Sequence, residues 1–338
     1  MSGGVDSSLS AALLVEQGYD VTGVYMKNWT ADLPGVKCPW ADDLADAKRV
    51  AVKLGIDFKV FDFESEYKQK VVDYMIDEYK NGRTPNPDVM CNQEVKFKLF
   101  LETALADGAD MIATGHYARV SNGVLVKAID DNKDQTYFLY RVTGEALKKT
   151  LFPIGEYDKP TVREMAQQRG LSTAAKKDSQ GICFVGQIGI REFLSQYINQ
   201  KPGDIIDKKT GQVLGRHDGA IFYTLGQRHG LELGGGLPYY VVGKDMDKNE
   251  VYVTTDLDDK TLWKDEVTLR DAHWINETPT DGNYQVRVRH RAPLIDVSLS
   301  ASGDVTNLKL KESLRAIAPG QSAVVYDGDV CLGGGIIV

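Results

Sequence analysis

The sequence predicts an α/β domain built on a doubly wound parallel sheet, followed by a small β-rich domain and a β-barrel. Up to about residue 198, short apolar runs alternate with amphipathic segments of helical period, which is typical of parallel strands joined by helices. Past Lys201-Pro202-Gly203 the chain changes to short β-rich runs separated by glycine, asparagine and aspartate. We therefore expect an α/β domain over residues 1–198, a small β-rich domain over 199–259 and a barrel over 260–338.

The expected elements of the α/β domain follow from the spacing of its apolar residues. Short buried runs predict strands at residues 21–26, 58–61 and 111–114. Amphipathic segments predict helices after residue 8 and at 42–54, 65–80, 93–106, 135–142, 161–169 and 188–198. Asn122-Gly123, between short apolar runs, predicts a hairpin turn. Ligands of such sheets bind beyond the carboxyl ends of the strands, where residues 2–8, Met26 and Gly115 are expected.

The second half of the chain is expected to consist mainly of strands. Runs that suit strands occupy residues 220–223, 239–242, 285–289, 297–299 and 323–326. Around the third of these runs, Arg287, Arg289 and Arg291 alternate with other residues, so a strand would place all three on one face. That face predicts a stripe for backbone phosphates if RNA binds, although a run of charges is more often a solvated face.

Composition limits the class of protein. The 338 residues, 42% hydrophobic and 26% charged, suit two or three globular domains. The net charge of −8 disfavours a protein that coats nucleic acid but leaves room for a local basic groove. No apolar run approaches the length of a membrane span and no signal peptide precedes the first motif, so we expect a cytoplasmic protein. Cys38, Cys91, Cys183 and Cys331 lie far apart, which disfavours a metal site and suits individually reactive thiols.

The first loop, Ser2-Gly3-Gly4-Val5-Asp6-Ser7-Ser8, is the predicted anion site. Its glycines permit a tight turn and close approach of a ligand, and its serines and aspartate stand where a helix begins. Free N–H groups and the positive end of the helix dipole favour phosphate there. The Walker A pattern is absent from the chain. The alternative is a flexible turn whose serines only cap the helix.

A second candidate loop joins Arg83 to Asn92. Pro85 and Pro87 stiffen it into an extended segment that presents Asn86, Asp88 and Cys91 just before a helix. A cysteine at a helix N-terminus should have a lowered thiol pKa, because the dipole favours the thiolate. The alternative is a stiff connection with an inert cysteine.

Three further segments carry candidate residues of lower specificity. Cys183 follows Lys176 and Lys177, whose charges would favour a thiolate, although Ile182 and Phe184 equally suit a buried, inert cysteine. Gly115 permits close approach of a nucleotide, and His116 beside it is either a polar contact or a hydrogen-bonded loop histidine. Lys133-Asp134-Gln135 opens a helix, where aspartate is also an ordinary N-cap.

Six motifs in order carry a resemblance over essentially the whole chain. They are S-G-G-V-D-S-S, R-T-P-N-P-D-x-x-C-N, A-T-G-H-Y-A-R, K-D-Q-x-Y-F-L-Y, K-x-S-Q-G-I-C-F and F-Y-T-L-G-Q-R. The first resembles the signature of the PP-loop ATP pyrophosphatases, and the set resembles the bacterial tRNA-specific 2-thiouridylase family. The resemblance implies a PP-loop domain (adenine nucleotide alpha hydrolase-like) with added helices, a small central domain and a C-terminal barrel. In that family a hydrophobic strand leads into the first loop; since the loop stands at Met1 here, we expect the central strand to be missing.

The resemblance also implies residue roles. ATP, with Mg²⁺, would be bound by Ser2, Gly3, Gly4, Val5, Asp6, Ser7, Ser8, Met26 and Gly115. The target base would meet Asn86, Pro87 and Asp88, with Asp88 as acid/base, Cys91 as nucleophile and Cys183 as persulfide carrier. The tRNA would contact His116, Lys133, Asp134, Gln135, Arg289, Gln321 and His290, where the family often has an aromatic residue.

The implied reaction is sulfur transfer to C2 of the wobble uridine, position 34 of the tRNA. AMP transfer to O2 makes that oxygen a leaving group, the persulfide attacks C2, and Cys91 completes S–S cleavage through a transient disulfide with Cys183. The sulfur would come from a cysteine desulfurase or a sulfur-relay protein. Three alternatives stay open: a PP-loop enzyme that adenylates a carboxylate, a non-catalytic RNA-binding protein, and an iron–sulfur site of Cys38, Cys91 and Cys183.

Overall fold

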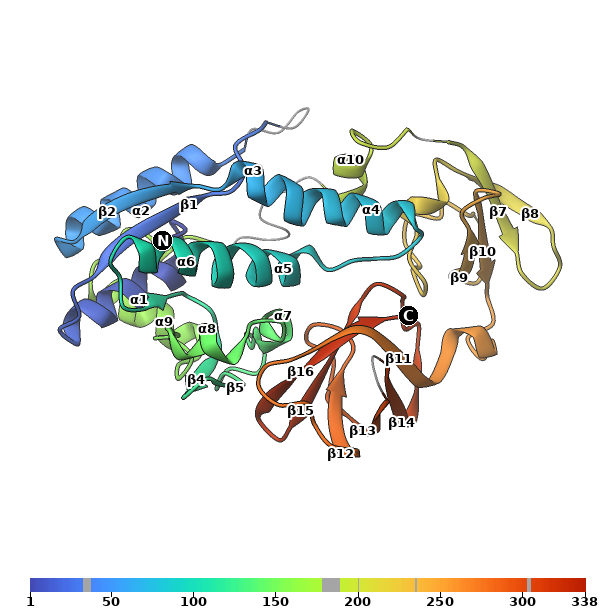
Figure 1. Cartoon of the computed structure of the whole chain (residues 1–338). Helices are drawn as coiled ribbons and strands as arrows, with labels where there is room; N and C mark the ends of the chain where they lie inside the picture. The colour runs from blue at the N-terminus through green and yellow to red at the C-terminus, as the bar shows by residue number, and fades with distance from the viewer. Residues whose placement is uncertain (33–37, 178–188, 200, 235, 303–304) are drawn as a thin grey trace.

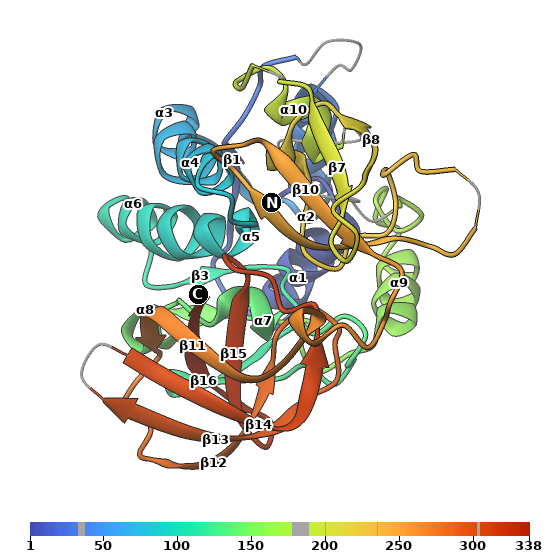
Figure 2. The same cartoon turned by 90° about the vertical axis from the view of Figure 1, so that its right-hand side faces the viewer.

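The computed structural model describes residues 1–32, 38–177, 189–199, 201–234, 236–302 and 305–338. Figure 1 shows three regions: an α/β part in blue to green, a group of strands in yellow to orange, and a barrel in orange to red. Figure 2 shows the barrel strands below and the middle strands above, with the helices of the α/β part beside both. Within the described residues, no helix is long and apolar enough to cross a membrane.

The α/β part contains two pairs of parallel strands. β1 (Thr22–Lys27) pairs with β2 (Asp57–Asp62), and β3 (Ile112–Ala113) pairs with β6 (Thr150–Leu151). Their alternation with helices confirms the predicted α/β class. In the described residues the two pairs are not joined by hydrogen bonds into one continuous sheet.

Helices surround these strands. They are α1 (Val5–Glu16), α2 (Trp40–Leu54), α3 (Glu64–Tyr67), α4 (Tyr74–Lys80), α5 (Pro87–Met90), α6 (Phe100–Ala106), α7 (Thr136–Leu139), α8 (Gly144–Lys148), α9 (Lys159–Gln168) and α10 (Ile190–Leu194). Leu9 and Leu13 of α1 pack in one cluster with Val50 of α2 and Val162 of α9. Gly55 ends α2 in the left-handed conformation with φ 68°, which glycine adopts at low cost. The pattern of the sequence therefore predicted most of these helices, but it missed α8, and α7 and α10 are shorter than the helices expected at 135–142 and 188–198.

Two long helical rods lie side by side in Figure 1. In the first, the π-helical segment η1 (Lys68–Asp73) joins α3 to α4, and in the second η2 (Cys91–Leu99) joins α5 to α6. Val71 and Met75 of the first rod share a buried cluster with Val95 and Phe97 of the second. The second rod begins earlier than the expected residue 93, because the Asn86 side chain caps it and Pro87 fits its first position.

The middle strands form one sheet of order β8-β7-β10-β9. Its members are β7 (Gly203–Asp207), β8 (Val213–His217), β9 (Tyr240–Asp245) and β10 (Glu250–Thr254). The expected strand at 220–223 is wrong: Ala220–Phe222 is the 3-10 turn η3. It follows Gly219, whose N–H donates to Nδ1 of His217 and so turns the chain out of the sheet.

The C-terminal strands close into a six-stranded barrel. They are β11 (Trp263–Trp274), β12 (Gly282–Arg287), β13 (Ile295–Ser302), β14 (Val305–Arg315), β15 (Ser322–Asp327) and β16 (Val330–Ile337), preceded by the 3-10 turn η4 (Lys260–Leu262). The order is β11-β14-β13-β12-β15-β16, and β11 pairs again with β16. The predicted barrel is therefore confirmed.

The expected Asn122-Gly123 hairpin is present as β4 (Arg119–Ser121) and β5 (Val124–Val126). β5 pairs with β16, so the hairpin joins the α/β part to the barrel.

Candidate active site

The first loop has the shape of a phosphate cradle. Gly4 is the N-cap of α1, so the helix begins at Val5 and leaves the N–H groups of its first turn without intrahelical partners. The hydroxyls of Ser7 and Ser8 both donate to the carbonyl of Gly4, at 3.3 and 2.7 Å. Gly3 has φ 72°, and a Cβ there would overlap the carbonyl oxygen of Asp43. The helix start and the glycine requirement both agree with the anion site expected from the sequence.

The other predicted ATP residues lie around this loop. A Cβ added to Gly115 would come within 2.6 Å of the backbone nitrogen of Ser7, so the two segments are in direct contact. The Met1 ammonium donates to the carbonyl of Val24, which places the start of the loop beside β1, two residues before Met26. At the end of β1, the buried Oδ1 of Asn28 has no hydrogen-bond partner among the described residues. The glycine cradle and the N–H groups at the helix start fit the phosphates of a nucleotide, and the unpaired oxygen of Asn28 can accept a hydrogen bond from its base or its ribose.

Asp6 is held by two residues that sequence reasoning missed. Lys159 donates to both carboxylate oxygens at 2.7 and 2.8 Å, and the Tyr117 hydroxyl donates at 3.0 Å. Lys159, at the start of α9, is 8% exposed. These contacts span more than a hundred residues of sequence, so no local spacing signals them.

The proline loop presents its polar residues as expected, with one correction. Asn86 caps α5 through a 3.2 Å hydrogen bond from the Asp88 N–H to its Oδ1. Cys91, however, does not lie at a helix N-terminus: the helix starts at Pro87, and Cys91 lies one turn in, 3% exposed. The dipole argument for its thiolate therefore fails. Burial raises the pKa of Asp88 above its ordinary value, and the Lys96 ammonium opposes that rise only in part.

The helix that carries Cys91 is connected through side-chain contacts to the first loop, residues 2–8, which we call the nucleotide loop. Lys96 of η2 lies 3.5 Å from Nε2 of His116, whose Nδ1 is 2.8 Å from the Thr114 hydroxyl. Burial and the Lys96 charge hold the pKa of His116 well below its usual range. His116 is next to Gly115, so η2, His116 and the loop at Ser7 form one continuous contact.

Asp134 and Gln135 make contacts inside the protein. Asp134 is 1% exposed and forms an ion pair with Arg287 of the barrel, 2.9 Å from its carboxylate. Gln135 accepts a 2.9 Å hydrogen bond from the Tyr117 N–H through its side chain. Lys133 belongs to the turn before α7, where its N–H donates to the carbonyl of Asp130 at 3.0 Å.

The barrel brings the remaining predicted residues to α7 and the proline loop. The His290 ring lies 4.5 Å from the Phe138 ring, and burial lowers the pKa of His290 to about 4. Gln321 donates to the carbonyl of Thr84 at 2.7 Å. Arg289 is an exposed residue whose guanidinium donates to the carbonyl of Ala316.

The expectation that three arginines share one strand face is wrong. β12 ends at Arg287, whose side chain is buried against Asp134. The chain then turns, and Arg291 has φ 63°, so only Arg289 and Arg291 are exposed. Alternation of residue types does not reveal where a strand ends.

Cys183 lies outside the described residues. Of the two lysines before it, Lys176 donates to Asp43 at 2.7 Å and to Asp46 at 2.6 Å, whereas Lys177 is exposed. Lys176 thus fastens the segment that leads to Cys183 onto α2, where the Asp43 carbonyl touches Gly3 of the nucleotide loop. In the part of the chain that the structure describes, no three His, Cys, Asp or Glu side chains are grouped to hold a metal ion.

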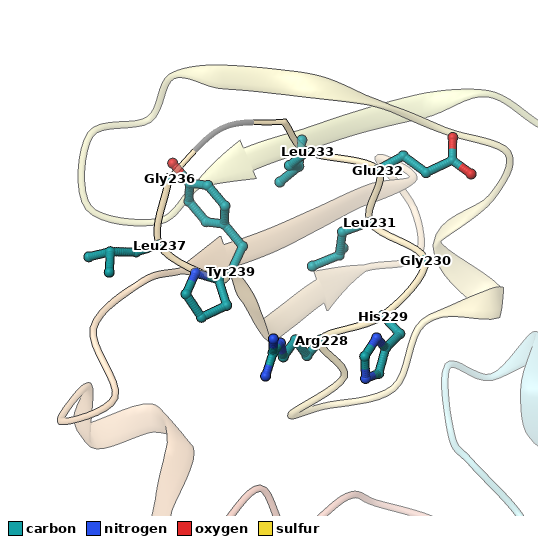
Figure 3. A pocket seen from close by; sticks show the side chains of 10 residues that line it. Arg228, His229, Gly230, Leu231, Glu232, Leu233, Gly236, Leu237 and Tyr239 are labelled. Carbon is teal, nitrogen blue, oxygen red and sulfur yellow. The ribbon is translucent and has the colours of Figure 1, made fainter.

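A separate pocket of about 350 Å³ lies in the middle region (Figure 3). It is lined by residues 228–233 and 236–239, with Leu231 and Leu233 among its apolar residues. None of the residues predicted for ATP, the base or tRNA lines it.

Comparison with known proteins agrees with this arrangement. Family models match residues 1–187 (tRNA methyl transferase HUP domain), 191–255 (tRNA methyl transferase PRC-barrel domain) and 264–337 (Aminomethyltransferase beta-barrel domain). The tRNA-specific 2-thiouridylases MnmA of Bacillus licheniformis and Bacillus subtilis are each 48% identical over 347 residues, covering 100% of this chain and 93% of theirs. A solved structure described as a predicted subunit of tRNA methyltransferase from Methanocaldococcus jannaschii has a TM-score of 0.32 and 21% identity, covering 49% of this chain and 73% of that chain, and is too distant to bear on the fold. This chain belongs to the tRNA-specific 2-thiouridylase family.

Proposed function

We propose that this chain is an ATP-dependent sulfurtransferase that converts the wobble uridine of tRNA to 2-thiouridine. The observation that carries the proposal is the continuous contact from the nucleotide loop through Gly115, His116 and Lys96 to the helix of Cys91 and Asp88. A site that activates a base with a nucleotide and then delivers sulfur needs these two loops side by side. The relatives at 48% identity are 2-thiouridylases, and a HUP domain suits ATP.

In this proposal Ser2 to Ser8, Met26 and Gly115 would hold ATP, and the Asp6 carboxylate would hold an accompanying Mg²⁺. The N–H groups at the start of α1 would receive phosphate oxygens. When bound, ATP supplies the AMP group that turns O2 of the uracil into a leaving group. The side chains of Lys159 and Tyr117 would hold the Asp6 carboxylate in place for binding Mg²⁺.

The uracil is proposed to lie against Asn86, Pro87 and Asp88. The Asp88 carboxyl would transfer a proton during the reaction. Its pKa, raised by burial, suits a group that both accepts and returns a proton. The terminal sulfur of a Cys183 persulfide attacks C2, and AMP leaves with the O2 oxygen. The Cys91 thiolate then attacks the Cys183 sulfur, which forms the Cys91–Cys183 disulfide and leaves both electrons of the broken S–S bond on the sulfur of 2-thiouridine. A thiol reductant restores the two cysteines.

The tRNA contacts divide by burial. Exposed Arg289 and the half-buried Lys133, Gln321 and His290 are proposed to touch the tRNA. Buried His116 and Asp134 and the half-buried Gln135 would act through the residues that they hold, namely Lys96, Arg287 and Tyr117. We further propose the domain division 1–198, 199–259 and 260–338, a cytoplasmic location, and a cysteine desulfurase or sulfur-relay protein as sulfur donor.

The test separates the two sulfur steps. Cys183→Ser should lose persulfide loading and keep AMP transfer to tRNA, whereas Cys91→Ser should load sulfur on Cys183 and release no 2-thiouridine. Cys38→Ser, a thiol outside the proposed pair, is the control and should behave as wild type. Persulfide is measured by gel shift, AMP transfer with radiolabel, and 2-thiouridine by mass spectrometry of nucleosides. Wild-type enzyme that releases no AMP with tRNA, or a double cysteine variant that remains active, would contradict the proposal.

A further inference from the structure

Glu78 joins three parts of the molecule through one buried carboxylate. It lies on α4 and is 6% exposed. Arg83, at the start of the proline loop, donates to both of its oxygens, from Nε at 2.8 Å and from a terminal nitrogen at 2.6 Å. Arg270 of barrel strand β11 donates to the same carboxylate at 2.7 Å. Burial alone would raise the pKa of Glu78, but the two guanidinium groups outweigh it and hold the pKa below its ordinary value.

The next residue of the loop is fixed from two further sides. The Thr84 N–H donates to the carbonyl of Pro319 at 2.9 Å, and Gln321 donates to the Thr84 carbonyl at 2.7 Å. The Thr84 hydroxyl lies 3.0 Å from that of Thr224 in the middle region. The barrel comes so close that a Cβ on Gly320 would be 2.8 Å from the Thr84 nitrogen. Figure 1 shows the loop between α4 and α5 reaching toward these two regions.

The path of the backbone at Arg83 and Thr84 determines where the proposed catalytic residues Asp88 and Cys91 lie. Pro85 and Pro87 fix their φ angles and restrict the residues before them, so this segment has little freedom to absorb a change at its start. Asp88 and Cys91 follow within eight residues of Arg83. Arg270 is itself held on the barrel side by Asp271, 3.1 Å away, and the Asp271 carbonyl accepts from Arg141 at 2.8 Å.

We propose that Glu78 is a positioning residue for the reaction: through Arg83 it orients the proline loop, and through Arg270 it ties that orientation to the seating of the barrel. This inference rests on the proposed function. Its physical basis is charge: the buried carboxylate stands between the guanidinium groups of Arg83 and Arg270, which are 32% and 35% exposed, and without it these two like charges repel each other and displace the loop. A displacement of about 1 Å at Asp88 is enough to slow the reaction on the order of 100-fold.

The test uses two matched pairs of variants. Glu78→Gln removes the charge at nearly constant shape, and its control is Glu16→Gln, which removes a carboxylate bound in the same two-pronged way by Arg169 at 2.7 Å on the outer face of α1. Arg270→Met removes the barrel contact, and Arg270→Lys restores a cation that can still make its single bond to Glu78. We expect kcat for thiolation to fall on the order of 100-fold in Glu78→Gln and tenfold in Arg270→Met, with KM for ATP unchanged, and to recover in Arg270→Lys.

Amide hydrogen exchange over residues 83–91 gives a readout that needs no turnover. Exchange should rise in Glu78→Gln and Arg270→Met and stay at the wild-type level in Glu16→Gln and Arg270→Lys. If Glu78→Gln does not fold, the variants Arg270→Met and Arg270→Lys decide the question. The Arg270 side chain is 35% exposed, and its loss leaves Glu78 paired with Arg83. The inference is overturned if Arg270→Met shows the amide exchange of wild type, or if its kcat for thiolation lies within twofold of the wild-type value. Wild-type enzyme without thiolation activity contradicts the proposed function instead, and the exchange data still decide the role of Glu78.

Discussion

Asp88 is the residue whose environment bears most directly on the chemistry. Burial raises its pKa, and Lys96 restrains the rise. The rate should therefore change with pH around a midpoint above that of an ordinary aspartate. Lys96→Met should move this midpoint to still higher pH, because it removes the charge that favours the carboxylate. Single-turnover thiolation rates from pH 4 to 8 test this, and a midpoint that does not move would exclude Asp88 as the titrating group.

Asp88→Asn should lower the thiolation rate by about 100-fold or more, because the amide cannot transfer the proton. ATP binding should be unchanged, since the residues proposed for ATP lie on the first loop and at Gly115. Asn86→Ala is the matched comparison: it removes the helix cap and should cost about 1 kcal/mol of folding stability. Calorimetry measures ATP binding and folding stability, and the rate assay measures thiolation, so a loss of proton transfer is distinguished from a loss of stability. Equal rates for Asp88→Asn and wild type would remove Asp88 from the mechanism.

The Asp134–Arg287 pair predicts a stability effect. Both side chains are buried, at 0% and 7% exposure, so removing one partner leaves an unpaired buried charge. Asp134→Asn or Arg287→Met alone should each cost about 3–5 kcal/mol of folding free energy, and the double variant should recover part of it. Chemical denaturation of the three variants measures this coupling. Additive losses would show that the ion pair contributes no coupling energy between the barrel and the segment before α7.

At the scale of elements, local patterns predicted helices well and their limits less well. The amphipathic segments at 65–80 and 93–106 are present as the two rods, but the second starts at Pro87 because of a cap that no apolar pattern reports. The glycine before Ala220 turned an expected strand into a 3-10 turn. The Asn122-Gly123 hairpin was predicted by its turn residues, with φ 48° and 79°. Its pairing with β16, some two hundred residues later, depends on tertiary contact and had no local signal.

The contact between Gly115 and α1 is the element-scale feature most open to test. Gly115→Ala would place a Cβ 2.6 Å from the Ser7 nitrogen and 2.8 Å from the Asp6 carbonyl carbon, so the nucleotide loop must move. We expect ATP affinity to fall about tenfold or more, because the N–H groups no longer converge on the phosphates. Gly234→Ala, where nothing lies within 4 Å, is the control. ATP binding by titration calorimetry gives the answer, and unchanged affinity in Gly115→Ala would exclude this contact from the site.

At the scale of the whole molecule, the sequence points to candidate segments but does not show how they are held. The motifs pointed to the first loop and the proline loop, and the resemblance added Arg289 and His290 of the barrel. Lys159, Glu78, Arg270 and Arg287 were missed as partners, because each acts on a residue far away in the chain. A single sequence shows residue types along the chain, and these ion pairs exist only in the folded protein.

The last prediction concerns how an acidic protein binds tRNA. The net charge is −8, so attraction must come from local exposed cations such as Arg289 and Arg291 near α7. Their joint replacement by alanine changes the charge from −8 to −10, and so does replacement of Lys309 and Lys311 on β14 of the same barrel. If the arginines neutralise phosphates, the slope of log K against log salt should fall by about 1–2 for the arginine variant and stay constant for the lysine variant. Equal slopes in the two variants would mean that bulk charge, and not this corner of the barrel, governs tRNA binding.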